Sequence, residues 1–117
     1  ALPLYRQAGI LKRFGGELGR GRLAANVMRA GQAVQPLVNL LRERLLDAAV
    51  VHGDETQVQV LKEPGRAAQT KSWLWVQCSG SSPPVRLITY APSRSAKTAV
   101  ELYDGARGAL MSDGYEV

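Results

Sequence analysis

The feature that most constrains the fold is a change of hydrophobic periodicity near residue 49. Before this point, apolar residues recur at spacings of four and three, which places them along one stripe of a helix. The stripe consists of Leu23, Val27, Ala30, Val34, Leu37, Leu41 and Leu45. After this point, β-branched and aromatic residues alternate with polar ones, which is typical of strands. We therefore expect an α/β chain of the α+β type, with a helical region over residues 1–48 and a mixed unit over residues 49–117.

Glycines divide the helical region. Gly15-Gly16 and the G-R-G of residues 19–21 interrupt the pattern, which predicts two helices. Pro36 lies inside the second stripe and predicts either a kink or a junction between helices. Two helices separated by a glycine break resemble a helix-turn-helix. An amphipathic arm that packs on the next domain, or on a second copy in a homo-oligomer, fits the same pattern.

The second region predicts three strands, a helix and a fourth strand. The expected segments are a strand over 50–60, a polar hairpin loop over 61–71, strands over 72–78 and 85–91, a helix that Ser93 or Ser95 caps, and a strand over 109–115. Short connections predict an antiparallel meander for the first three strands. The helix is then a crossover that lets the fourth strand lie parallel to one of them.

Positive charge is concentrated in the N-terminal third of the chain. Residues 1–44 carry eight Lys and Arg against two acids, a net charge of +6, whereas residues 45–117 carry seven against eight, a net charge of −1. A basic helical surface suits contact with the phosphates of a nucleic acid, although a solvated helix carries similar charges. The candidate contacts are Arg20, Arg22 and Arg29 near the second helix and Lys97 at the start of the crossover helix.

Composition limits the class of protein. The apolar runs are far shorter than the roughly 20 residues of a membrane span, so we expect no membrane segment. A single cysteine, Cys78, excludes an internal disulfide and a cysteine-based zinc cage. That cysteine usage is compatible with a reducing cytoplasm, which is the compartment we expect.

Two acids are candidates for a metal site. Asp54 lies on the first expected strand and Asp113 at the end of the fourth. If the crossover places these strands side by side, the two carboxylates converge, and a proton or a cation must neutralise them. Hard oxygen ligands of this kind favour Mg²⁺ or Mn²⁺. An Asp before a glycine, as at Asp113, is also a common turn former, so both interpretations stay open.

Several segments together resemble a known family. They are L-P-L-Y-R-Q, R-L-A-A-N-V, H-G-D-E-T-Q-V-Q-V-L, W-L-W-V, Y-A-P-S-R-S and G-A-L-M-S-D-G-Y-E-V, in this order along residues 1–117. In that order they resemble the transposases of the insertion sequence 66 family, which are bacterial acid-triad enzymes with a ribonuclease-H-like core. The resemblance implies a helical arm followed by the β-β-β-α-β start of that core, and metal-dependent cleavage and strand transfer on DNA ends.

The resemblance also implies roles for single residues. Asp54 and Asp113 match the first two acids of the metal-binding triad, which would hold two Mg²⁺ or Mn²⁺ ions in the complete enzyme. The third acid, a glutamate on a downstream helix, has no counterpart before Val117. We therefore expect a fragment that does not catalyse strand transfer alone. A non-catalytic DNA-binding or oligomerisation remnant is the alternative.

The neighbours of Asp54 have different expected roles. Glu55 points to the opposite face of the strand, because side chains alternate, so a solvent or salt-bridge role is expected. His52 shares the face of Asp54, but a lone histidine is more often structural. Trp73 and Trp75 alternate on one strand face, a pattern that more often fills a core than stacks on bases.

Overall fold

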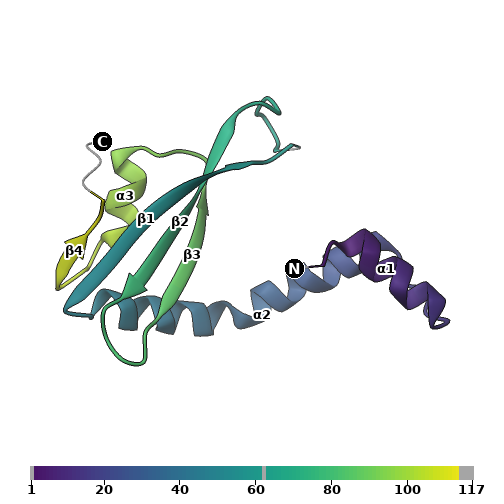
Figure 1. Ribbon diagram of the computed structural model, residues 1–117, viewed down its shortest axis with the longest axis horizontal. Helices are drawn as coiled ribbons and strands as arrows, with labels where there is room; N and C mark the ends of the chain where they lie inside the picture. The colour runs from purple at the N-terminus through teal and green to yellow at the C-terminus, as the bar shows by residue number, and fades with distance from the viewer. Residues whose placement is uncertain (1, 62, 114–117) are drawn as a thin grey trace. The chain divides into compact units, whose positions relative to one another are not determined.

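The computed structural model describes residues 2–61 and 63–113. The chain forms two compact units, Ala1–Asn39 and Leu40–Val117. The elements, labelled in Figure 1, are α1 (Leu4–Arg13), α2 (Arg20–Leu46), β1 (Val50–Gln59), β2 (Lys71–Ser79), β3 (Arg86–Ala91), α3 (Ala96–Tyr103) and β4 (Ala109–Met111). The predicted α+β class is confirmed. The predicted domain division at residues 48 and 49 stays a prediction.

The first unit contains α1 and the N-terminal part of α2. Helix α1 follows Pro3, whose fixed φ suits a helix start, and Lys12 and Arg13 occupy its last turn. Gly15 then adopts a φ of 81°, and Gly16 donates a 2.9 Å backbone hydrogen bond to the Leu11 carbonyl, which closes the helix end. The predicted break between two helices is confirmed, although the second helix begins already at Arg20.

Helix α2 continues through Pro36, so the predicted alternative of a junction between two helices at this residue is wrong. A proline inside a helix removes one backbone hydrogen bond, and the remaining turns on both sides keep the helical path here.

The second unit is built on a four-stranded sheet with the order β3-β2-β1-β4. Strands β1, β2 and β3 form an antiparallel meander, and β4 pairs parallel with β1 after the crossover through α3. The predicted topology is confirmed. Ser95 is the N-cap of α3 and accepts a hydrogen bond from the backbone N–H of Thr98. The fourth strand is shorter than predicted, because residues 112 and 113 are not paired; residues 114 and 115 lie outside the described residues.

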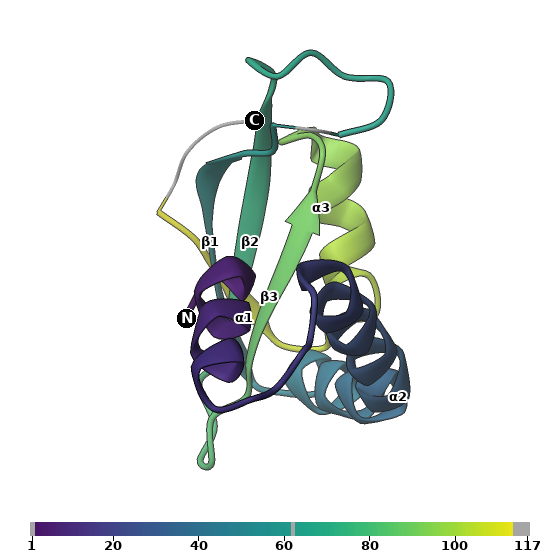
Figure 2. The same cartoon turned by 90° about the vertical axis from the view of Figure 1, so that its right-hand side faces the viewer.

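One face of the sheet carries the core. Leu45 from the end of α2 packs with Ala48, Val51 and Val85, and Leu102 from α3 packs with Trp75 and Ala91. Figure 2 shows α3 alongside this face of the sheet. The last turns of α2 are also tied to α3, because Arg42 donates a 2.5 Å hydrogen bond from its guanidinium to the Glu101 carbonyl. Positive charge at the end of α3 complements the helix dipole.

The opposite face of the sheet carries Asp54. Strand pairing places His52, Asp54, Val76, Ile88 and Met111 on this face, since paired residues point to the same side. Ile88 is 68% exposed and Met111 is 57% exposed. Among the residues that the structure describes, the cluster contacts of α2 and α3 all belong to the other face.

A polar network holds the β1–β2 hairpin loop against the sheet. Glu63 accepts hydrogen bonds from the Tyr90 hydroxyl, from Arg66 at 2.7 Å and from the fully buried Ser72 at 3.2 Å. Arg66 also donates to the Pro92 carbonyl at 2.8 Å. The Tyr90 hydrogen bond and the positive charge of Arg66 lower the pKa of Glu63, because they stabilise its carboxylate form.

Candidate functional site

The candidate site lies where β4 joins the edge of β1. The chain reaches this edge through Gly108, where a Cβ atom would lie 2.3 Å from the carbonyl oxygens of Ala48 and Ala49. Only a residue without a side chain permits this approach. The backbone N–H of Ala109 then donates to the Ala49 carbonyl at 2.9 Å, and parallel pairing begins.

The pairing of β4 with β1 ends before either predicted acid. Met111, the last residue of β4, pairs with His52 of β1. Asp54 lies two residues further along β1, whereas Asp113 lies two residues after the end of β4 in a segment that does not pair with β1. Asp54 is exposed, and its Oδ1 accepts a 2.8 Å hydrogen bond from the backbone N–H of Glu55. An exposed carboxylate of this kind suits a hard cation by its chemistry.

A small pocket lies on the core side of β1. It has a volume of about 160 Å³ and is lined by Gly53, Glu55, Trp75, Arg94, Ala99, Tyr103, Leu110, Ser112 and Asp113. Asp113 therefore borders this pocket, whereas Asp54 does not line it. The predicted convergence of the two carboxylates is therefore not seen: Asp54 is exposed on β1, and Asp113 borders the core-side pocket.

The Glu55 side chain faces that pocket and forms an ion pair with Arg94. The Arg94 guanidinium also lies 5.2 Å from the centre of the Trp73 ring, a cation–π distance. The prediction that Glu55 faces away from Asp54 is confirmed, and of the two expected roles, solvent contact or a salt bridge, the structure shows the salt bridge. Trp75 is 5% exposed and belongs to the core, as predicted for the alternating tryptophans.

Tyr103 of α3 packs against the backbone of β1 beside Asp54. A Cβ atom on Gly53 would lie 2.0 Å from the Tyr103 hydroxyl oxygen, so the glycine creates the space for this hydroxyl. Burial raises the pKa of Tyr103, and the negative charges of Glu55 and Asp54 raise it further. No role at the site is predicted for Tyr103 from the sequence. It lies one turn after Ala99, and both line the same pocket, but no local sequence pattern indicates its contact with Gly53.

The donor set for a metal is incomplete in the described chain. Within residues 2–61 and 63–113, no group of three or more His, Cys, Asp and Glu side chains is placed to hold a metal ion. Aspartate carboxylates are chemically suited to Mg²⁺ or Mn²⁺, which keep several waters and take further oxygen ligands from substrate. The residues present therefore fit part of such a site.

The predicted nucleic-acid contacts lie on exposed helical surfaces. Arg20, Arg22 and Arg29 are exposed along α2 in the first unit. Lys97 is exposed in the first turn of α3 and lies 3.9 Å from Glu101, an ion pair that solvent screens strongly.

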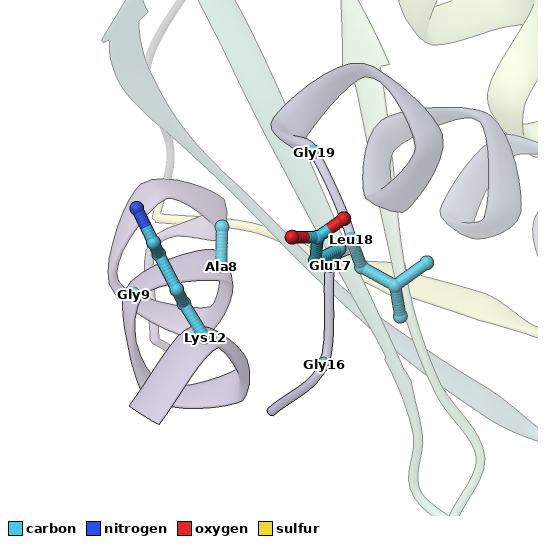
Figure 3. Close-up of a pocket in the computed structure, with 7 residues that line it drawn as sticks. All are labelled: Ala8, Gly9, Lys12, Gly16, Glu17, Leu18 and Gly19. Carbon is cyan, nitrogen blue, oxygen red and sulfur yellow. The ribbon is translucent and has the colours of Figure 1, made fainter. Parts of the chain in front are cut away.

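The first unit also contains an open hollow between α1 and the glycine-rich connection to α2. It measures about 390 Å³ and is lined by Ala8, Gly9, Lys12, Gly16, Glu17, Leu18 and Gly19. Figure 3 shows Lys12 on α1, Glu17 on the connection, and the Leu18 side chain directed away from α1. Its charged lining residues are one lysine and one glutamate, whose charges cancel. The hollow therefore has no net positive charge that would attract a phosphate.

Comparison with known proteins identifies the family. The sequence model described as "Transposase IS66 family" matches residues 1–117. The chain belongs to the IS66 transposase family. This confirms the resemblance seen in the sequence.

Curated relatives of this chain include two proteins of Sinorhizobium fredii. The chain is 34% identical over 120 residues to the protein named "Uncharacterized protein y4qI", with 97% of this chain and 22% of the relative covered. It is also 34% identical to "Uncharacterized protein y4jD", with 97% and 23% covered. The chain thus spans about a fifth of the length of the curated relatives it matches. No solved structure matches it. None of the helices in the described part of the chain has the length and hydropathy of a bilayer span.

Proposed function

We propose that this chain forms the first part of a ribonuclease-H-like catalytic core of an IS66-family DNA transposase. The observation that carries the proposal is the parallel pairing of β4 with β1, which brings the segment that leads to Asp113 beside the strand that contains Asp54. The order β3-β2-β1-β4 with a helical crossover supports the same core. The substrate would be DNA, and the reaction would be phosphoryl transfer: strand cleavage followed by strand transfer.

In this proposal the two aspartates hold the divalent ions. When bound, Mg²⁺ or Mn²⁺ supplies activation of the attacking water or hydroxyl and stabilisation of the leaving oxygen. The Asp54 carboxylate is oriented by the backbone N–H of Glu55, which keeps one of its oxygens in a fixed direction. Glu55 itself is engaged with Arg94 on the other side of β1 and takes no part in the metal site.

The first unit would contribute DNA contacts. Residues 1–39 carry six Lys and Arg against one acid, Glu17, a net charge of +5. Arg20, Arg22 and Arg29 would neutralise phosphates along α2, and Lys97 would do so from α3. Phosphate contacts of this kind give affinity without sequence preference. The bacterial cytoplasm is the compartment where such a protein would act.

Metal binding by aspartate variants tests the catalytic part. We expect Mn²⁺ titrated into the 117-residue chain to bind weakly, and Asp54→Asn and Asp113→Asn each to weaken binding about tenfold or more, because each removes one anionic ligand. Asp47→Asn is the control, since Asp47 is exposed and lies 3.3 Å from Arg107, away from the two acids. Calorimetry or electron paramagnetic resonance of free Mn²⁺ measures the change.

Two results would count against this proposal. Equal Mn²⁺ binding by the unmodified chain and by both variants would exclude the aspartate pair as the site. The absence of any Mn²⁺ binding, together with intact DNA binding, would favour the non-catalytic DNA-binding remnant.

A further inference from the structure

Helix α2 carries an apolar face that the described chain does not cover. Every residue from 26 to 40 is exposed. Val27 is 61% exposed, Val34 49% and Leu37 57%, which are large values for side chains of this kind. Further along the same stripe, Leu41 and Leu45 pack in the core of the second unit, so that part of the stripe already has a packing partner.

The spacing along this face is that of a coiled-coil seam. The apolar residues of this face are separated alternately by four and three residues, so their average spacing is 3.5 residues. They are Leu23, Val27, Ala30, Val34, Leu37 and Leu41. A repeat of 3.5 keeps an apolar seam facing a partner helix that winds around it with a left-handed supercoil. The fully buried helix of a globular core would not require this strict repeat.

The residues that flank the seam are small or apolar. Gly31, Ala33, Val38 and Leu40 occupy the flanking positions of the two central heptads. Charges at these positions normally select a partner of opposite charge. The sequence has no charged residue at these four positions. Charge therefore does not exclude any partner helix, and two identical copies can approach across the seam without electrostatic repulsion.

The opposite side of α2 is mostly polar. It carries Arg29, Gln32, Gln35 and Asn39, with Pro36 and the exposed Met28 among them, so the proline ring lies outside the seam. Arg22 and Arg29 are seven residues apart and share this outer side. Arg29 is the one cation between residues 23 and 41. A helix that lies on an anionic membrane would need a strongly basic polar face, and this one is nearly neutral.

We propose that α2 pairs in parallel and in register with α2 of a second copy of this chain, through the seam formed by Val27, Ala30, Val34 and Leu37. The small residues Ala30, Gly31 and Ala33 allow the two helices to approach closely. The outer arginines of both copies remain exposed on the flanks of the pair. The pairing does not depend on the aspartates, so it can hold or fail independently of the proposed catalytic function.

Oligomeric state with matched variants tests the pairing. Sedimentation equilibrium of the 117-residue chain should show a monomer–dimer equilibrium in the micromolar range. Leu37→Asp should raise the dimer dissociation constant about tenfold or more, because it buries a charge in the seam. Gln32→Asp introduces the same side chain on the outer side of the same helix and should leave the dimer constant unchanged. Circular dichroism checks that both variants retain the fold.

Cysteine cross-linking gives a second readout that does not require a destabilising change. In a Cys78→Ser background, Val34→Cys should form an intermolecular disulfide on mild oxidation, and Gln32→Cys should form far less. A parallel pair brings the two copies of residue 34 together at the seam.

Three outcomes would overturn the inference. One is a chain that stays monomeric throughout the micromolar range, as expected if another part of a longer protein covers the seam. Another is a dimer that Leu37→Asp and Gln32→Asp weaken equally. The third is a monomer that binds phosphatidylserine-containing vesicles and loses this binding with Leu37→Asp, which would assign the face to a membrane.

Discussion

At the scale of residues, Gly53 and Tyr103 determine how closely α3 approaches the strand that carries Asp54. A Cβ atom on residue 53 would lie 2.0 Å from the Tyr103 hydroxyl oxygen and 2.9 Å from the Tyr103 Cζ atom. The aromatic ring is held between the strand and the helix core, so it cannot move away as freely as a long flexible side chain.

Gly53→Ala is therefore expected to destabilise the chain by about 1–3 kcal/mol, the usual cost of overpacking. The Gly53→Ala/Tyr103→Phe double variant should recover part of this loss, because it removes the atom that the new methyl group meets first. Urea unfolding of the two variants and of Tyr103→Phe alone measures the coupling. Strictly additive losses would mean that the two residues do not meet as described.

The network around Glu63 predicts a pH dependence of stability. Its pKa lies below the ordinary value of 4.5, with the Tyr90 hydrogen bond as the largest cause. A carboxyl whose pKa is lower in the folded than in the unfolded chain stabilises the fold above the unfolded pKa, and this contribution is lost as the pH falls through the folded pKa. Thermal unfolding from neutral pH to about pH 3 should therefore show a loss of stability on the acid side of 4.5.

Tyr90→Phe isolates that contribution. The variant should be less stable at neutral pH and should lose less stability below pH 4.5 than the unmodified chain. Lys97→Met is a control, since it removes an exposed ion-pair partner far from Glu63 in the sequence and should keep the acid-side loss. Parallel acid-side curves for Tyr90→Phe and the unmodified chain would contradict the assignment to Glu63.

The sequence predicted part of this residue-level picture. The alternation of a strand was enough to separate Asp54 from Glu55 and to group Trp73 with Trp75. The contacts of Tyr103 with Gly53, and of Glu63 with Tyr90, were not predicted. They join residues 50 and 27 positions apart, and no local pattern specifies which side chains a crossover or a hairpin loop brings together.

At the scale of elements, α2 presents its arginines on an exposed helical surface, and this predicts a salt dependence of DNA binding. Each phosphate contact contributes about 0.9 to the slope of log affinity against log salt concentration. Replacing Arg20, Arg22 and Arg29 together by Ala should make the slope shallower by roughly 2 to 3. Fluorescence anisotropy with a short labelled duplex at several salt concentrations measures the slope.

Arg86→Ala is the control for this prediction. Arg86 is exposed on β3 of the second unit and its loss also removes a positive charge. This substitution should change the slope by less than the value of about 0.9 that one phosphate contact contributes. A triple arginine variant with an unchanged slope would remove α2 from the DNA interface.

Periodicity and turn chemistry predicted the helices and strands that the structure describes, and the capping serine fixed the start of α3. The differences arise where local signals compete with the surroundings. Pro36 suggested a junction, but the turns on both sides keep α2 continuous. The apolar run after Gly108 suggested a strand to residue 115, whereas β4 pairs with β1 over three residues only.

At the scale of the whole molecule, the chain combines a basic helical unit with a sheet unit that holds two candidate ligands. The antiparallel meander and a parallel fourth strand could be predicted because short connections and a helical crossover leave few topologies, whereas the strand that β4 pairs with stayed open in the sequence. The full set of metal ligands could not be predicted, because ligands that come from distant segments leave no local pattern in these 117 residues. The chain spans about a fifth of its curated relatives, so the activity of a whole transposase stays a proposal.

The central claim is that Asp54 of β1 and Asp113, two residues after β4, together bind a divalent ion. The most direct measurement is the broadening of backbone amide signals by Mn²⁺ in a nuclear magnetic resonance spectrum of the 117-residue chain. We predict selective broadening around residues 52–56 and 111–113 together, and its disappearance in the Asp54→Asn/Asp113→Asn double variant. Broadening that centres on Glu17 or Glu63, or that persists in the double variant, would contradict the claim.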